Sequence, residues 1–223
     1  MKPVWISEDA ELQREHLSAA CQSLYRRGWM PGTFGSVSVR SGEAVMITAG
    51  DLSKRVMTDQ DTVMVDPFKG LPLLGESEWP PAETPVHLAL YRRLPGCGAV
   101  IHAHAPWSTA LATRTAGADR TGQVVFEEME MAKSLDVPDP RLVVLPIVAN
   151  HLDASLIADD VTALLDDPAA DTPPALLIDR DGMFSFGRDI DEARNRLECV
   201  EELSHLLLLT GADEPGTAKV SAR

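Results

Sequence analysis

Two kinds of hydrophobic periodicity alternate along nearly the whole chain of 223 residues, and no internal repeat or long linker interrupts them. Val37 and Val39 alternate with polar residues, and the turn residues 41–43 then lead into residues 44–48, a pattern that predicts a β-hairpin. Residues 7–27, in contrast, carry apolar side chains at helical spacing between a possible N-cap, Ser7, and a terminating Gly28. A chain that mixes both periods must pack helices against a sheet.

The remaining elements follow from the same two periods. We expect strands at residues 62–65, 99–104, 124–126, 142–148 and 175–178. We expect helices from Thr84-Pro85 to a stop at Pro95-Gly96, and at residues 128–135, 154–165 and 189–209. The sequence therefore predicts an α/β fold in which a mostly antiparallel central sheet is flanked by helices. We expect one domain over residues 1–210 and a polar C-terminal tail over residues 211–223.

Composition excludes several classes of protein. A hydrophobic content of 44% is enough for one substantial core, and no apolar run is long enough for a membrane span or a signal peptide, so we expect a cytoplasmic protein. The net charge of −14 without a basic block argues against nucleic acid or an anionic membrane as a partner. Cys21, Cys97 and Cys199 are odd in number and lack CxxC spacing, which indicates reduced thiols in the core.

The strongest chemical signal is His102-Ala103-His104 at the end of a predicted strand. Side chains two apart on a strand point to the same side, so both imidazoles could reach one divalent ion, and zinc suits such ligands. The alternative is that the two histidines only form local hydrogen bonds at the strand end. Glu83, just before a predicted helix, and Glu130, on a short one, could each approach such an ion as ligand or general acid/base, or remain surface charges.

Several motifs in order resemble those of the class II aldolase/adducin superfamily. They are found at residues 28–40, at Thr48 and Lys54, at residues 80–84 and 98–104, and then at residues 130–133, 144–150 and 182–189. The resemblance covers roughly residues 9 to 210. The Glu-Met-x-Lys and Val-x-Pro-Ile-x-x-Asn elements are most similar to the methylthioribulose-1-phosphate dehydratases of methionine salvage.

This resemblance implies a zinc-dependent lyase that acts on a phosphorylated ketose, in a homotetramer with sites near subunit interfaces. His102 and His104 match two of the three zinc histidines, and Glu130 matches the acid/base residue of the dehydratases. Glu83 matches the glutamate that serves the sugar-phosphate aldolases in that role, so an aldolase is the second hypothesis. A non-catalytic member, as in the adducin branch, is the third.

Departures from the family pattern affect the metal and phosphate sites. Asp181 stands where the third zinc histidine is expected; it could bind the ion or be a turn residue, and His151 is the other candidate. The resemblance assigns phosphate binding to Gly35, Ser36, Thr48 and Lys54. Asp51 and Pro81 replace residues that suit a phosphate, and Arg40, Arg55 and Lys133 could help Lys54 to supply compensating charge.

Overall fold

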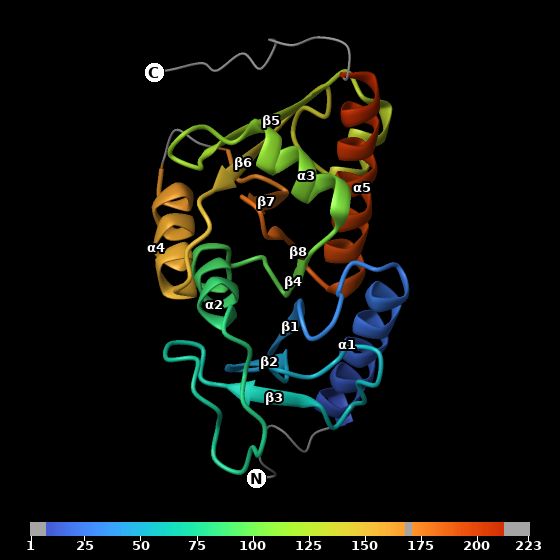
Figure 1. Cartoon of the computed structure of the whole chain (residues 1–223). Coiled ribbons are helices and arrows are strands. Elements are labelled where there is room, and N and C mark those ends of the chain that lie inside the picture. Colours follow the sequence, from blue (N-terminus) through green and yellow to red (C-terminus); the bar gives the residue numbers. More distant parts are fainter. Residues whose placement is uncertain (1–7, 168–170, 212–223) are drawn as a thin grey trace.

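The computed structural model describes residues 8–167 and 171–211 (Figure 1). Eight strands form one sheet in the order β3-β2-β1-β4-β8-β7-β6-β5, and every neighbouring pair is antiparallel except β6 and β7. The strands are β1 (Ser36–Ser41), β2 (Ala44–Thr48), β3 (Thr62–Val65), β4 (Ala99–Ala103), β5 (Gly122–Glu127), β6 (Leu142–Val148), β7 (Ala175–Ile178) and β8 (Gly182–Gly187). The predicted α/β fold with a mostly antiparallel sheet is confirmed.

Helices cover both faces of the sheet. Four elements pack on one face: α1 (Glu8–Arg26), α3 (Pro106–Thr115), the 3-10 helix η2 (Glu130–Leu135) and α5 (Ile190–Thr210). On the other face lie α2 (Thr84–Arg93) and α4 (Ala154–Leu165), which contact each other. Figure 1 shows α5 as a long helix beside the strands, and it contacts β8, β4 and β7. Each face therefore has its own apolar core.

The division into two cores follows from strand periodicity. In β4, Val100 packs in the core beneath α2 and α4, whereas Ile101 packs in the core beneath α1, α3 and α5. Because of the same alternation in β1, Val37 packs in the core beneath α1, α3 and α5, whereas Ser36 and Ser38 point toward α2. Because both faces are covered, these serines are buried rather than solvated.

The sequence analysis missed two elements, β8 and α3. The strand β8 begins and ends with glycine, which is depleted in strands, so its sequence is a weak strand signal; even so, it lies in the middle of the sheet between β4 and β7. The helix α3 follows Ala105, which cannot cap it, and only Ser108, Leu111 and Ala112 of its residues are buried. Its amphipathic signal is accordingly weak.

The other expected elements are present, with bounds shifted by a few residues. The strand expected at 124–126 extends over Gly122–Glu127, and the helix expected at 189–209 spans Ile190–Thr210 with Asp189 as its N-cap. The predicted cap Ser7 lies outside the described residues, as do residues 212–223 of the predicted tail, so the domain limit stays a prediction. Among the helices of the described part, none is both long and apolar enough to cross a membrane.

Candidate metal centre

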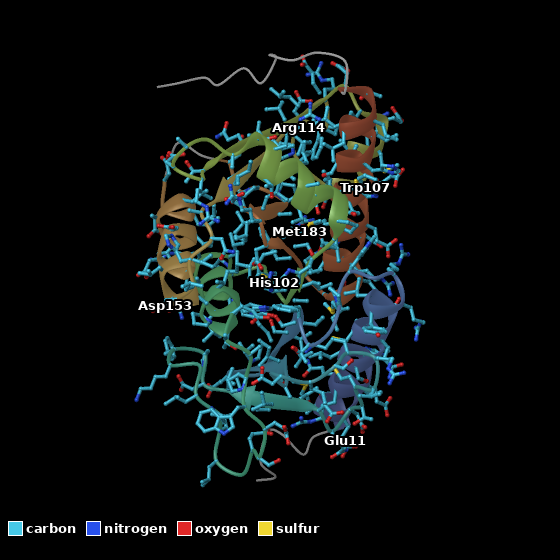
Figure 2. All side chains as sticks on the ribbon, viewed as in Figure 1. Glu11, His102, Trp107, Arg114, Asp153 and Met183 are labelled. Atoms are coloured by element: carbon cyan, nitrogen blue, oxygen red, sulfur yellow. The ribbon has the colours of Figure 1, made fainter. Side chains whose placement is uncertain are left out.

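The pairing of β4 with β8 brings two distant segments together at one end of these central strands. In this register Ala103 lies opposite Met183, so the residues just beyond these strand ends, His104 and Asp181, meet there. A side chain at Gly182 would place its Cβ 2.2 Å from the Ala103 carbonyl oxygen, so only glycine allows this close approach. His102 lies near the middle of the molecule beside α2 (Figure 2).

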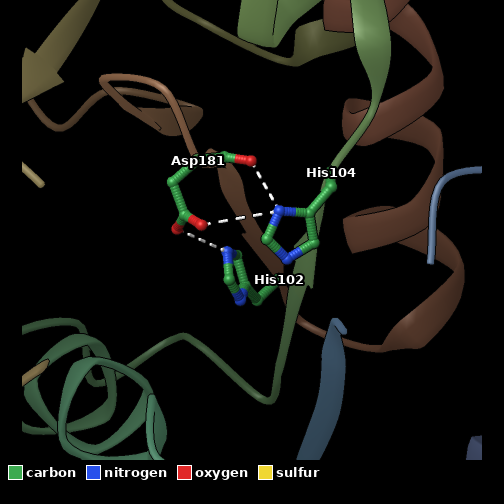
Figure 3. A group of neighbouring side chains, drawn as sticks. All are labelled: His102, His104 and Asp181. Carbon is green, nitrogen blue, oxygen red and sulfur yellow. Dashed lines mark hydrogen bonds and ion pairs between the residues drawn. The ribbon is translucent and has the colours of Figure 1, made fainter. Parts of the chain in front are cut away.

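Three side chains form a compact cluster of possible metal ligands: His102, His104 and Asp181. Their ligand atoms all lie within 4.8 Å of one another. His102 Nε2 is 3.2 Å from Asp181 Oδ2, and His104 Nδ1 is 3.5 Å from Asp181 Oδ1 (Figure 3). The two imidazole centroids are 4.7 Å apart. The same-side geometry expected for the two histidines is thus present, and Asp181 adds a carboxylate.

Each histidine has its Nδ1 occupied by an oxygen of the protein. His104 Nδ1 donates to the backbone oxygen of Asp181 at 2.5 Å, and His102 Nδ1 lies 3.4 Å from Glu83 Oε1. Such contacts fix the tautomer of metal-binding histidines and leave the other nitrogen free for the ion. The His104 Nε2 atom is buried and has no hydrogen-bond partner in the described part of the chain. A buried imidazole nitrogen without a hydrogen-bond partner fits a bound divalent cation.

The charges in the cluster also favour a cation. Burial alone would lower the pKa of His102, but hydrogen bonds with Asp181 and Glu83 outweigh burial and raise the pKa to about 9. Burial raises the pKa of both carboxyl groups, and the interactions with His102 reverse this and hold each pKa below its ordinary value. Two carboxylates around one imidazole therefore attract positive charge, which a proton or a metal ion can supply.

Aromatic rings hold the imidazoles in place. Phe184 of β8 stacks on His102 with ring centroids 4.2 Å apart and planes 5° from parallel. Phe34 meets His104 edge to face at 5.2 Å, and its own side chain is exposed. Gly35, with φ +82°, follows Phe34, and a Cβ there would meet the His102 carbonyl oxygen at 3.0 Å. The loop before β1 therefore packs directly against the candidate ligands.

The two predicted acid/base glutamates have different positions. Glu83 contacts His102, but Glu130 is 85% exposed and pairs with Lys133. Strand β5 starts level with the strand ends that hold the cluster and runs toward the opposite ends of the strands before the chain reaches Glu130. Its length alone separates Glu130 from the cluster by roughly 20 Å. Within one chain, Glu83 is near the histidines and Glu130 is not.

The predicted phosphate-binding residues lie at the strand ends that hold the cluster, but their polar atoms form hydrogen bonds with other groups of the protein. The Ser36 hydroxyl contacts Glu83 Oε1 at 2.9 Å, and Thr48 Oγ1 accepts a hydrogen bond from the Val37 amide. Lys54 is fully buried and donates to three backbone oxygens, those of residues 33, 49 and 52. These bonds use all three of its donors. Burial lowers the pKa of Lys54 despite nearby acidic groups.

His151, the other candidate for the third ligand, is not part of the cluster. Its Nε2 pairs with Asp160 of α4 at 2.9 Å, on a half-exposed surface. Sequence reasoning also missed a buried residue behind the cluster, His87. It lies four positions after Glu83 and therefore on the same face of α2, and this spacing is the signal that could have revealed it.

Comparisons with known proteins agree with this geometry. Residues 15–208 match the family "Class II Aldolase and Adducin N-terminal domain". The chain is 39% identical over 88% of its length to a probable bifunctional methylthioribose-1-phosphate isomerase/methylthioribulose-1-phosphate dehydratase of Nocardia farcinica, and spans 35% of that protein. It is 34% identical to the methylthioribulose-1-phosphate dehydratase of Xanthomonas euvesicatoria, with 85% of each chain covered.

Solved structures give the same result for the fold. The protein YgbL of Escherichia coli superposes with a TM-score of 0.74 at 25% identity and 92% coverage of both chains. The L-fuculose-1-phosphate aldolase of Thermus thermophilus has a TM-score of 0.70 at 21% identity, over 91% of this chain and 97% of the aldolase. On the family match and these relatives, the chain belongs to the class II aldolase and adducin family.

Proposed function

We propose that this protein is a metal-dependent lyase that dehydrates 5-methylthioribulose 1-phosphate in methionine salvage, in the cytoplasm. The observation that carries the proposal is the cluster of His102, His104 and Asp181, whose ligand atoms lie within 4.8 Å of one another and whose two histidines each have Nδ1 engaged by a protein oxygen. The relatives that the chain resembles over most of its length include proteins named methylthioribulose-1-phosphate dehydratases, and this supports the dehydration reaction.

Zinc is the ion that this ligand set suits best, because two imidazoles and one carboxylate leave a position for substrate. When bound, the ion would act as a Lewis acid on the substrate's carbonyl oxygen and make the adjacent C–H more acidic. Asp181 adds a negative charge where the family has a neutral histidine. We therefore expect slower turnover than a site with three histidines would support.

Proton transfer needs a carboxylate near the substrate carbon. Glu83 lies at the cluster in the same chain, and this favours it as the group that moves the proton. Glu130, which matches the acid/base residue of the dehydratases, could act only if a second copy of the chain carried it to the cluster. Glu83 as the base also fits the second candidate function, cleavage of a C–C bond as in the aldolases.

A homotetramer is part of the proposal. Two observations support contact between copies near Glu130. First, Glu130 lies far from the cluster of its own chain. Second, β5 and β6 expose a row of apolar side chains, in which Val125 and Val144 are cross-strand partners and Leu142 follows on the same face. Exposed apolar patches of this kind mark protein interaction surfaces.

For the phosphate, we propose the loops that carry Gly35, Ser36, Thr48 and Lys54. These loops meet at the strand ends that hold the cluster. Lys54 would attract the phosphate through its charge beneath the loops and not through a free N–H, because its donors are used. Replacing Lys54 with methionine should therefore weaken substrate binding and also destabilise the loops.

Metal analysis is the first test. Protein purified without added metal should contain about one zinc or similar divalent ion per chain, and replacement of His102 and His104 by alanine should remove it. His151→Ala is the matched control, because this histidine pairs with Asp160 outside the cluster. A wild-type protein that stays metal-free in excess zinc would contradict the enzyme hypotheses and favour a non-catalytic, adducin-like role.

Product analysis separates the two reactions. With 5-methylthioribulose 1-phosphate, dehydration gives a single diketone, whereas aldol cleavage gives two shorter carbonyl compounds. Mixing then tests the role of Glu130: subunits with Glu130→Gln and subunits with His102→Ala should restore activity together if Glu130 acts across copies. A double variant with both changes in one chain is the control. No recovery in mixed oligomers would assign proton transfer to Glu83.

A further inference from the structure

A continuous row of buried and partly buried polar side chains runs between β1 and α2, behind the candidate metal centre. The two elements present matching spacings, because two residues of a strand rise about 6.7 Å and four residues of a helix rise about 6 Å. Side chains two apart on β1 therefore meet side chains four apart on one face of α2. The row consists of Ser36, Ser38 and Arg40 from β1, and Glu83, His87 and Tyr91 from the start and body of α2.

The contacts along the row are short and unbroken. Ser36 Oγ lies 2.9 Å from Glu83 Oε1 and 2.9 Å from His87 Nε2. On the other side of the imidazole, His87 Nδ1 lies 2.7 Å from Ser38 Oγ, which is 2.9 Å from the Tyr91 hydroxyl. Both serines, His87 and Tyr91 are buried. Burying so many polar groups is costly unless each one is hydrogen-bonded, and here each contact supplies a partner.

The chemistry of the groups gives these hydrogen bonds one direction. Glu83 is a carboxylate at neutral pH and only accepts hydrogen bonds, so Ser36 must donate to it. Ser36 has a single hydrogen and must then accept from His87 Nε2. Burial lowers the pKa of His87 to about 3, so this imidazole is neutral and its Nδ1 accepts from Ser38. The Tyr91 hydroxyl donates to Ser38 in turn.

At its other end, the row meets the candidate metal ligand His102. Glu83 Oε1 is shared between the Ser36 hydroxyl and His102 Nδ1. We propose that His87 is a positioning residue for the metal centre: through Ser36 it orients the Glu83 carboxylate, which keeps the proton of His102 on Nδ1 and leaves Nε2 for the ion. This inference rests on the proposed metal-binding role of His102. It assigns a function to a buried histidine that touches none of the three cluster residues by a hydrogen bond.

Other roles for these residues fit less well. A helix and a strand can pack with apolar side chains at no polar cost, so packing does not require this row. The groups that orient metal ligands, in contrast, are hydrogen-bonded in turn by further groups, and losing one of them typically lowers metal affinity about 10- to 100-fold. The row ends on the ligand itself, which is the arrangement that such orientation needs.

The first test reads the position of the proton directly and needs no variant. In the full-length protein with 15N-labelled histidine, two-bond proton–nitrogen spectra distinguish the two neutral tautomers and the imidazolium. His87 should carry its proton on Nε2 in both metal-free and zinc-loaded protein, and His102 should carry it on Nδ1 when zinc is bound. A His87 that is protonated on Nδ1, or on both nitrogens at neutral pH, would overturn the proposal.

The second test measures zinc affinity by competition with a chromophoric chelator. Ser36→Ala breaks the row beside Glu83 and should weaken zinc binding about tenfold, and His87→Gln should have a similar effect. Ser185→Ala is the matched control, because this buried hydroxyl on β8 has no hydrogen-bond partner among the described residues. Melting curves verify that each variant is folded.

The outcomes separate this inference from the proposed function. If wild type binds zinc and both Ser36→Ala and His87→Gln bind it as tightly, the metal centre stands and the positioning role of His87 is refuted. If wild type binds no zinc, the metal centre itself fails and the inference falls with it, even where the His87 tautomer is as expected. Loss of affinity in Ser36→Ala with wild-type affinity in Ser185→Ala supports the proposal.

Discussion

Glu201 of α5 should be one of the largest single contributors to stability, because it caps another helix. The residue before α3 is Ala105, which offers no side-chain acceptor. Glu201, which is far from Ala105 in the sequence, supplies the missing acceptor. Its carboxylate accepts hydrogen bonds from the backbone N–H groups of Trp107 and Ser108 at 2.9 Å each, and from the Ser108 hydroxyl at 2.8 Å. It is only 3% exposed, so water cannot easily replace it.

The expected cost follows from these contacts. Glu201→Ala leaves the N–H groups of Trp107 and Ser108 without their acceptor at about 1–3 kcal/mol each, so we expect a loss of about 2–6 kcal/mol. Glu201→Gln keeps the shape and one acceptor oxygen, but it removes the charge that favours a helix N-terminus and turns an NH2 toward a donor. We expect a loss of about 2 kcal/mol for this variant. The alanine loss is a large share of the stability of an ordinary domain.

Urea unfolding at one fixed protein concentration measures these differences, because association of chains would otherwise change the apparent stability. Glu202→Ala is the matched control: this neighbouring side chain is 50% exposed, and we expect a change within about 0.5 kcal/mol. Hydrogen exchange should also speed up at the amides of Trp107 and Ser108 in Glu201→Gln. The reasoning is refuted if Glu201→Ala loses less than about 1 kcal/mol or no more than the control.

Three further predictions concern the site and its surroundings. Gly182→Ala should abolish metal binding and lower the melting temperature, because its Cβ would lie 2.2 Å from the Ala103 oxygen, whereas Gly96→Ala, with nothing within 4 Å, should be neutral in both measurements. Asp181→Ala should weaken zinc binding in the chelator assay and Asp181→His should retain it and raise lyase activity; equal affinity and rate in all three proteins would make Asp181 a turn residue. The pKa of His87 is about 3 in the folded protein and about 6.5 in the unfolded chain, so its contribution to stability is complete above pH 6.5 and declines as the pH falls. Below pH 6.5, His87→Gln should therefore reduce the pH dependence of the free energy of unfolding, measured with urea, by up to about 1.4 kcal/mol per pH unit. The same pH dependence in wild type and variant would contradict the buried neutral state of His87.

Local periodicity was sufficient to predict most of the fold from the sequence. The helices and strands with clear patterns, such as α4 and β6, have the predicted bounds. The pair His102 and His104 could also be found, because the period of a strand places residues two apart on one side. Where the local signal was weak, prediction failed: β8 begins and ends with glycine, and α3 depends on a cap from α5.

The composition of the site was decided by contacts that no local pattern encodes. Asp181 meets His102 across 79 positions of sequence because β8 pairs with β4, and the resemblance to a family, not periodicity, pointed to it. Glu130 lies far from the cluster of its own chain because β5 runs away from the strand ends that hold the cluster.

Lys54 and His87 illustrate the same division. A lysine in a polar loop is ordinarily solvated, but here the packing of two loops buries it completely and uses its three donors. His87 has an ordinary place on an amphipathic helix, and only the approach of β1 to α2 links it to Glu83. By itself, the sequence determined which residues share a face of one element, because that depends on a repeat of a few residues. The tertiary structure alone decided which faces meet, because strand order and register join residues far apart in the chain.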